Sequence, residues 1–301
     1  MSSRPTMNRI LLIGADGQVG WELRRALAPL GQVIAAARSG RAGLRVDLAE
    51  RASLHRLFDD TVPDAVVNAA AYTAVDRAES EPETARAING EALATIGERA
   101  AALGIPVLHY STDFVFAGDA DRPYREDDLP APLNVYGRTK LAGEQALLAS
   151  GAHALILRTA WVYGVRGNNF LLTMLRLFRE RQEVRVVDDQ IGTPTWSRLL
   201  AAASANVLYR LLRGDLDPAR VRGVYHVAAA GATSWHGFAT TIGEATGATC
   251  RIVPIPSSEY PAPAVRPRYS VLDTQRFYAT FGLVLPDWRQ SLALCLADLG
   301  Y

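Results

Sequence analysis

Cysteine is scarce in this sequence, which has only Cys250 and Cys295 among its 301 residues. Two thiols so far apart form neither a disulfide framework nor a closely spaced metal-binding pair, and they suit a reducing compartment. The five histidines also lack the short spacing that metal ligands usually show. The sequence therefore predicts no metal site and a cytoplasmic location.

An excess of charge of one sign is missing as well. The 32 basic and 31 acidic residues leave a net charge of +1, so neither nucleic acid nor a membrane surface is an expected partner. No long apolar run precedes the first predicted strand, which argues against a signal peptide or a spanning helix. We expect residues 1–6 to form a short disordered leader, with Met7 as an alternative start.

Short apolar runs alternate with helical patterns over the first half of the chain. Because continuous apolar strands separated by helices are buried on both faces, the pattern predicts a Rossmann-type doubly wound parallel sheet of the α/β class. This domain is expected to cover residues 7–160, together with segments that return to it later. The predicted strands are 9–14, 32–37, 64–70, 105–112 and 153–159, and the first helices are about 18–30 and 84–103.

The pattern is looser after residue 160. Helices are expected at 170–181 and 196–212, and strands at 183–187 and 223–229. The proline-rich stretch 252–273 cannot form one regular element, because proline interrupts both helices and sheets. We expect residues 161–301 to form mainly a smaller substrate-binding lobe that packs back onto the sheet.

The stretch "GADGQVG" follows the first predicted strand and places Gly14, Gly17 and Gly20 three residues apart. Glycine permits a sharp turn and a close approach of backbone N–H groups to a pyrophosphate, while the last glycine permits close packing of the helix. Phosphate would then lie at the helix N-terminus. The alternative is a turn with no ligand, but the flanking strand and helix favour dinucleotide binding.

The second predicted strand ends in Ala37 and Arg38, where many NAD-binding proteins carry an acidic residue. Without that carboxylate, and with an arginine available to pair with a 2′-phosphate, the sequence favours NADPH, with NADH as a second acceptable cofactor. Arg38 could equally be an ordinary surface residue. Asp47 has two interpretations as well: it accepts a hydrogen bond from the adenine, or it caps the next helix.

Three side chains after later strands suggest acid–base chemistry. Tyr136 and Lys140 are four residues apart on one face of a predicted helix. A nearby ammonium lowers the pKa of a phenol, and the same lysine can bind a ribose hydroxyl. Thr112 lies in "YSTDFVF" at the end of the fourth strand, on the edge where such sheets bind ligands, and its hydroxyl could contact a substrate carbonyl.

Together these motifs resemble the extended short-chain dehydrogenase/reductase family, and within it the reductases of nucleotide-linked sugars. The resemblance extends over nearly the whole chain from Met7, through "GADGQVGWEL", "NAAAYTAVDRAESEP", "HYSTDFVFAG", "PLNVYGRTKLAGE" and "RPRYSVLDT". It implies that NAD(P)H donates a hydride to the ketone of a dTDP-sugar, that Tyr136 donates the proton, and that Thr112 orients the carbonyl. Lys140 would hold the ribose and lower the pKa of Tyr136.

The resemblance also implies which residues line the two ligands. The residues expected around the cofactor are Gly14, Gly17, Gln18, Val19, Arg38, Asp47, Leu48, Ala70, Ala71, Tyr72, Tyr110, Tyr136 and Lys140. Asp113, Trp161 and Arg266 are expected to contact the nucleotide-sugar, Arg266 through its diphosphate. Tyr269 stands where an asparagine is expected, which is a departure from the family pattern. Some relatives use magnesium at a homodimer interface; a homodimer is compatible with this sequence, but no magnesium motif is evident.

Two other functions fit the same motifs. The family includes a non-catalytic regulatory subunit of methionine adenosyltransferase, and it includes sugar epimerases and dehydratases that recycle their cofactor. The presence of Thr112, Tyr136 and Lys140 favours an enzyme over a regulator. Stoichiometric consumption of NADPH would separate a reductase from an epimerase.

Overall fold

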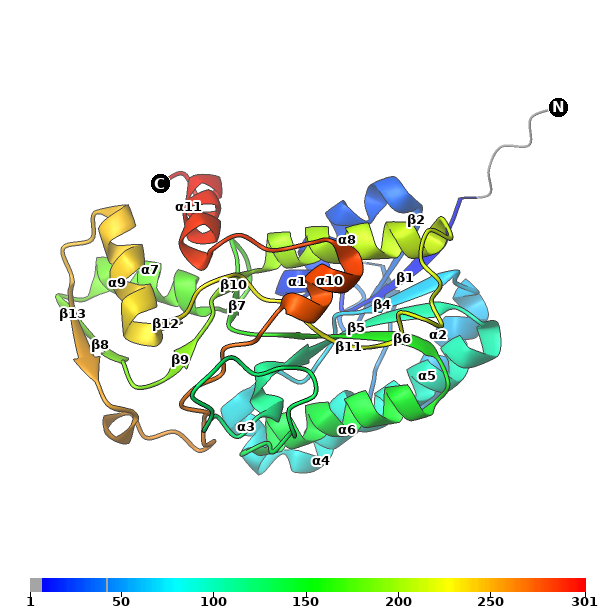
Figure 1. The fold of residues 1–301 in the computed structure, drawn as a ribbon, viewed down its shortest axis with the longest axis horizontal. Helices are drawn as coiled ribbons and strands as arrows, with labels where there is room; N and C mark the ends of the chain where they lie inside the picture. Colours follow the sequence, from blue (N-terminus) through cyan, green and yellow to red (C-terminus); the bar gives the residue numbers. More distant parts are fainter. Residues whose placement is uncertain (1–6, 42) are drawn as a thin grey trace.

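The computed structural model describes residues 7–41 and 43–301, so the predicted leader at residues 1–6 lies outside the described residues. A central sheet with helices on both faces forms the larger part of the molecule (Figure 1). A smaller lobe lies at one end of this sheet. It is built around α7 (Phe170–Glu180), β8 (Glu183–Val187), α9 (Trp235–Thr246) and β13 (Arg251–Ile255). The N-terminal half of the chain forms most of the sheet, and the C-terminal half forms most of the lobe.

The central sheet has seven strands, in the order β11-β6-β5-β4-β1-β2-β3, and all neighbours are parallel. The strand order reverses direction between β1 and β4, which is where sheets of this type bind ligands. This confirms the predicted doubly wound α/β fold. The strands are β1 (Arg9–Ile13), β2 (Gln32–Ala37), β3 (Leu44–Arg45), β4 (Ala65–Asn68), β5 (Pro106–Thr112), β6 (His153–Thr159) and β11 (Gly223–His226).

Helices cover both faces because successive strand residues point to opposite sides. In β1, Ile10 and Leu12 belong to one buried cluster, while Leu11 and Ile13 belong to the other. The first cluster is covered by α1 (Gln18–Ala26), α8 (Ser197–Leu212) and α10 (Gln275–Phe281). The second is covered by α2 (Arg51–Thr61), α5 (Ala92–Leu103) and α6 (Val135–Ala149).

The smaller lobe has a core of its own, which includes Tyr163, Phe238 and Trp288. Its elements are α7 (Phe170–Glu180), β8 (Glu183–Val187), α9 (Trp235–Thr246), β13 (Arg251–Ile255) and α11 (Trp288–Asp298), with the short pairs β7 (Val162–Tyr163) with β10 (Thr195–Trp196) and β9 (Ile191–Gly192) with β12 (Thr233–Ser234). The proline-rich stretch begins with β13, which pairs only with β8, so Pro254 occupies an edge position where a missing N–H is tolerated.

The helix expected at 84–103 is interrupted. It consists of α4 (Pro82–Arg86), a π-helical turn (Ala87–Glu91) and α5. The turn directs Asn89 inward, where its amide accepts a hydrogen bond from the main-chain N–H of Tyr72 (2.8 Å) and donates to Thr139 (3.1 Å). The π turn therefore ties α6 to the segment after β4, in keeping with the frequent occurrence of such turns at functional sites.

Candidate active site

The glycine turn packs against the segment that follows β4. Gly14 has a φ of +85°, and a Cβ on it would collide with the backbone of Ala69 and Ala70. A Cβ on Gly20 would collide with the carbonyl oxygen of Gly14, so both positions require glycine. No side chain caps the N-terminus of α1, which leaves its first N–H groups free to bind an anion at the point of strand-order reversal.

Several other residues expected around the cofactor already have hydrogen-bond partners or are buried in the protein. The side-chain oxygen of Gln18 accepts a hydrogen bond from Asn169 (2.8 Å), and Val19 packs partly buried against the core. One oxygen of Asp47 accepts from the N–H of Ala49 (3.0 Å), whereas the residue at the N-cap of α2 is Glu50. Asp47 therefore closes the turn before α2 rather than capping the helix. Leu48 beside it is buried.

The corner where β2 ends carries charges of both signs. Arg38 is exposed, and its guanidinium has no hydrogen bond or ion pair with any residue in the described part of the chain. Ser39 donates a hydrogen bond to the carboxylate of Asp16, which comes from the glycine turn. An arginine available for a phosphate thus lies one residue from a serine bound to an acidic side chain.

Thr112 and Asp113 lie buried at the carboxyl end of β5. The hydroxyl of Thr112 accepts a hydrogen bond from the N–H of Phe114 (3.1 Å) and donates to one oxygen of Asp113 (3.0 Å). The second carboxylate oxygen of Asp113 is buried without a partner in the described residues. Burial raises the pKa of Asp113 to about 6, although hydrogen bonds from Ser270 and Thr112 oppose the shift.

Tyr136 lies in the first turn of α6, next to this pair. Burial raises its pKa to about 12; a hydrogen bond with Thr112 opposes the rise, and the charge of Asp113 adds to it. The lowering expected from Lys140 stays a prediction, because Lys140 is not among the groups that shift the pKa of Tyr136 in this structure. The physical reason is that the ammonium nitrogen is directed elsewhere.

Lys140 is directed toward β5 and is almost completely buried. Its Nζ donates to the carbonyl oxygen of Tyr110 (2.7 Å) and lies 3.0 Å from Nε2 of His109. Burial lowers the pKa of Lys140 to about 8, while the charge of Glu144 partly opposes that shift. Lys140 is thus anchored to the sheet below the site.

The hydroxyls of Tyr72 and Tyr110 already have partners. Tyr72 donates to Glu81 (2.8 Å) and accepts from Arg77 (2.9 Å), while Tyr110 donates to Ser204 on α8 (2.5 Å). Strand alternation directs the ring of Tyr110 to the face opposite Lys140. A contribution of Tyr110 to a cofactor site would therefore come from its main chain. Ala70 and Ala71, which follow β4, remain partly exposed.

The start of α6 is held against the end of β5. Asn134 caps the helix by accepting from the N–H of Gly137 (2.8 Å), and its amide donates to the carbonyl of Val265 (2.8 Å). A Cβ on Gly137 would collide with the carbonyl oxygen of Phe114, which belongs to the 3₁₀ turn Asp113–Val115. The glycine after Tyr136 thus permits the close approach that brings the phenol to Thr112.

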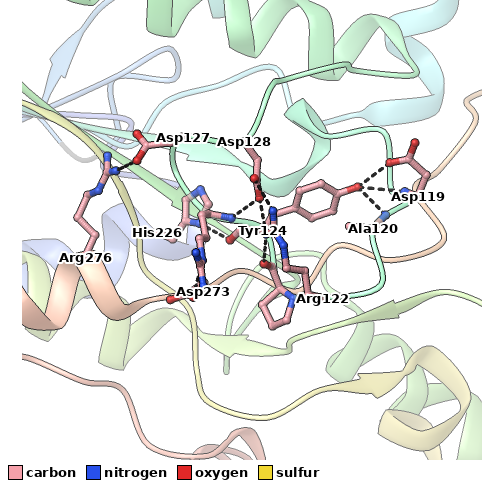
Figure 2. A network of polar contacts seen from close by, with 11 residues as sticks. Asp119, Ala120, Arg122, Tyr124, Asp127, Asp128, His226, Asp273 and Arg276 are labelled. Atoms are coloured by element: carbon pink, nitrogen blue, oxygen red, sulfur yellow. Dashed lines mark hydrogen bonds and ion pairs between the residues drawn. The ribbon is translucent and has the colours of Figure 1, made fainter.

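The loop before α6 is braced by the polar network in Figure 2. The hydroxyl of Tyr124 accepts hydrogen bonds from three consecutive N–H groups, at Gly118, Asp119 and Ala120 (2.9–3.1 Å), and its carbonyl oxygen contacts the ring of His226 (3.0 Å). The same loop also forms two ion pairs, Arg122 with Asp128 and Arg276 with Asp127. Residues from β11 and α10 thereby fix the loop that leads to Tyr136.

Two stacked aromatic side chains lie where the chain leaves β6 for the smaller lobe. Trp161 follows β6 with a positive φ of 45°, a strained conformation for a side chain of this size. Its indole stacks on that of Trp235 at the start of α9, with centroids 3.5 Å apart and planes within 4°. Gly192 lies against Trp161, because a Cβ there would collide with the indole.

Arg266 has an acidic partner within the protein. Its guanidinium forms a two-point ion pair with Asp76 (3.0 and 2.7 Å), which holds the pKa of Asp76 below its usual value. The pair fastens the proline-rich loop to α3 (Val75–Ser80). Tyr269, at the position where asparagine was expected, joins the loop to Gly118 through its main-chain N–H (3.2 Å).

Several polar residues behind the site were not predicted from the sequence. Ser111 and Arg158 both bond the carboxylate of Glu144, and Arg158 and Glu144 are 3% and 2% exposed, respectively. His109 lies beside Lys140. The available signal was the alternation in "HYST", where His109 and Ser111 face α6 while Tyr110 faces α8.

Two kinds of feature are absent from residues 7–41 and 43–301. No group of three or more histidine, cysteine, aspartate or glutamate side chains is placed to hold a metal ion. No helix in this part of the chain has the length and apolar character needed to cross a membrane.

Comparison with known proteins shows strong similarity along almost the entire chain. The family model described as "RmlD substrate binding domain" matches residues 7–300. A dTDP-4-dehydrorhamnose reductase of Burkholderia thailandensis is 48% identical over 299 residues, covering 97% of this chain and 99% of its own length.

Solved structures of proteins with the same name are also similar to this chain over nearly its whole length. A dTDP-4-dehydrorhamnose reductase of Clostridium acetobutylicum has a TM-score of 0.88 at 34% identity, covering 97% of this chain and all of that one (100%). The enzyme of the same name from Bacillus anthracis, solved in complex with NADP, has a TM-score of 0.88 at 32% identity, with 97% and 99% coverage.

Proposed function

Because the chain belongs to the RmlD family of dTDP-4-dehydrorhamnose reductases, we propose that it reduces the C4 ketone of dTDP-4-dehydro-L-rhamnose to give dTDP-L-rhamnose. The reductant is NADPH, in keeping with the NADP complex of the Bacillus anthracis relative. The observation that carries the proposal is the meeting of Thr112, Asp113 and Tyr136 at the carboxyl end of β5.

The raised pKa of Tyr136 suits a proton donor. At about 12 it keeps the phenol protonated at neutral pH, ready to deliver its proton to the oxygen that gains negative charge. NADPH supplies the hydride when bound. Thr112 donates its own proton to Asp113, and this bond holds the threonine side chain beside the phenol of Tyr136, where we place the ketone. Lys140 would hold the cofactor ribose from below.

The residues present fit a dinucleotide at the turn between β1 and α1. Two observations support this proposal: a Cβ at Gly14 or Gly20 would collide with the neighbouring backbone, so the turn is closely packed, and the first N–H groups of α1 are uncapped. We assign the pyrophosphate to Gly17, Gln18 and Val19, the adenine to Asp47 and Leu48, and the middle of the cofactor to Ala70, Ala71 and Tyr72.

The substrate is assigned to the space beside Trp161 and Asp113. The unpartnered oxygen of Asp113 is a hydrogen-bond acceptor suited to a sugar hydroxyl, because an unpaired buried acceptor is costly until a donor reaches it. The ion pair with Asp76 and the bond to Ala264 use Nη1 and Nη2 of Arg266, so the Nε–H of the same guanidinium is left for the diphosphate.

One assay tests the proposed function against its rivals. Purified protein is mixed with dTDP-4-dehydro-L-rhamnose, and oxidation of NADPH and of NADH is followed separately by absorbance. We expect one NADPH to be consumed for each sugar reduced. A folded protein that binds NADPH but never oxidises it would indicate a regulatory subunit, and conversion of the sugar without net NADPH loss would indicate an epimerase.

Replacing Arg38 by alanine is expected to weaken NADPH binding while leaving NADH binding nearly unchanged. Arg38 is the exposed cation at the end of β2, and losing a charge-assisted hydrogen bond to a 2′-phosphate typically costs about 1.5–3 kcal/mol. That cost corresponds to a roughly 10- to 150-fold higher Kd for NADPH. Fluorescence titration with both cofactors measures it. Equal losses for NADPH and NADH would contradict the assignment of Arg38 to the 2′-phosphate.

A further inference from the structure

Three buried side chains form a hydrogen-bonded row behind the site, on the side of Lys140 that faces the sheet. Nδ2 of Asn68 lies 3.1 Å from Nδ1 of His109, and Nε2 of His109 lies 3.0 Å from Nζ of Lys140. Asn68 and His109 are completely buried, and Lys140 is 1% exposed. The reaction described above assigns no role to His109.

A main-chain amide determines the direction of these hydrogen bonds. The N–H of Ala70 donates to the side-chain oxygen of Asn68 (3.0 Å), and because a backbone N–H can only donate, that oxygen must face it. The NH₂ group of Asn68 therefore faces Nδ1 of His109, and the main-chain carbonyl of Asn68 is a second group within reach of the ring. A neutral imidazole carries one proton; with the amide as the donor to Nδ1, that proton lies on Nε2 and points at Lys140.

A second proton on His109 is strongly disfavoured. Burial, and next the charge of Lys140, lower the pKa of His109 well below its usual value. When Nε2 of His109 directs its N–H at Nζ, an ammonium at Lys140 can offer only another N–H, so no hydrogen bond forms between the two groups. A neutral amine instead accepts this hydrogen bond with its lone pair and still donates to the carbonyl oxygen of Tyr110.

We propose that His109 is a positioning residue that disfavours the ammonium form of Lys140 in the free enzyme, so that NADPH binding is coupled to uptake of a proton. The inference rests on the proposed contact between Lys140 and the cofactor. The phosphates and ribose oxygens of NADPH favour the ammonium, because they supply negative charge and hydrogen-bond acceptors.

The other groups around Lys140 are consistent with this coupling. Glu144, one turn further along α6, favours the ammonium, but its charge is compensated by Arg158 from β6. Tyr136, one turn earlier, is uncharged at neutral pH. With the pKa of Lys140 at about 8 in the free protein, half of the molecules lack this proton at pH 8.

The tautomer of His109 can be observed directly in the wild-type protein. Nitrogen NMR of protein labelled with ¹⁵N-histidine resolves only five rings, and the signals lost in His109→Gln identify the ring of interest. We expect Nε2 to carry the proton and Nδ1 to be unprotonated. A proton on Nδ1, donated to the main-chain carbonyl of Asn68, would leave Nε2 free to accept from an ammonium and would overturn the proposal.

Calorimetry tests the coupling. Titration of NADPH at pH 8 in two buffers of different ionisation enthalpy is expected to show uptake of about half a proton by the wild type. In His109→Gln the amide can turn its oxygen to Nζ and stabilise the ammonium, so the uptake should fall severalfold. His153→Gln, at the opposite end of the sheet, is the matched control and should behave as wild type. Equal uptake in wild type and His109→Gln, or none in wild type, would refute the coupling.

A second variant covers the case in which His109→Gln does not fold. Asn68→Asp keeps the acceptor for the N–H of Ala70 and offers His109 a carboxylate oxygen, which draws the ring proton to Nδ1. Nε2 then accepts from the ammonium, and proton uptake should again be lost. All these measurements follow NADPH binding alone, so a failure to reduce the sugar would refute the proposed function without deciding this inference.

Discussion

Replacing Tyr136 by phenylalanine is expected to lower kcat for sugar reduction about 10²- to 10⁴-fold, the range for loss of a general acid. The corresponding loss of transition-state stabilisation is about 2.7–5.5 kcal/mol. Removing one oxygen leaves the ring in its edge-to-face contact with Phe114 (5.8 Å), so α6 should keep its position. Stopped-flow measurement of NADPH oxidation with saturating sugar would isolate this step.

NADPH binding provides the internal check on this variant. Most of the contacts assigned to the cofactor lie away from the phenol of Tyr136, for example at the glycine turn, Arg38 and Lys140, so the Kd for NADPH should stay within about twofold of wild type. Tyr278→Phe, which removes a hydroxyl from an exposed tyrosine on α10, is the matched control and should retain full activity. If Tyr136→Phe kept more than a tenth of the wild-type kcat, Tyr136 would not be the proton donor.

Replacing Glu144 by glutamine is expected to lower the free energy of unfolding by about 3–5 kcal/mol. The carboxylate of Glu144 binds Arg158 through both oxygens (2.6 Å for the shortest contact) and also accepts from Ser111. Glutamine keeps the size of the side chain but leaves the buried guanidinium with no compensating charge. Because β5, β6 and α6 meet at this pair, we expect the substitution to destabilise the whole sheet and not one strand alone.

Urea denaturation measures this difference in the free energy of unfolding. Glu180→Gln is the matched control, because Glu180 pairs with Arg176 on the exposed surface of α7 (2.9 Å). Exposed pairs of this kind contribute roughly 0.3–0.5 kcal/mol. Similar losses in the two variants would show that the Glu144–Arg158 pair is no more important than an exposed one.

The sheet and the glycine turn could be predicted because their signals are local. Apolar runs such as the one ending at Gly14 identify buried strands, and the glycine spacing reflects close packing that the structure confirms at Gly20. Two contacts that could not be predicted join residues far apart in the chain. Lys140 is directed by His109, and Arg266 is held by Asp76, which is 190 residues away in sequence. Spacing within one helix or loop carries no information about such partners.

The face-to-face indoles of Trp161 and Trp235 give the molecule a built-in optical signal. One ring belongs to the segment leaving β6 and the other to α9 of the smaller lobe, so rotation of the lobe against the sheet must slide or open the stack. Stacked indoles at 3.5 Å couple their electronic transitions, and that coupling falls steeply with separation. A change in the near-ultraviolet circular dichroism would therefore report a change in how the two indoles stack, without any attached label.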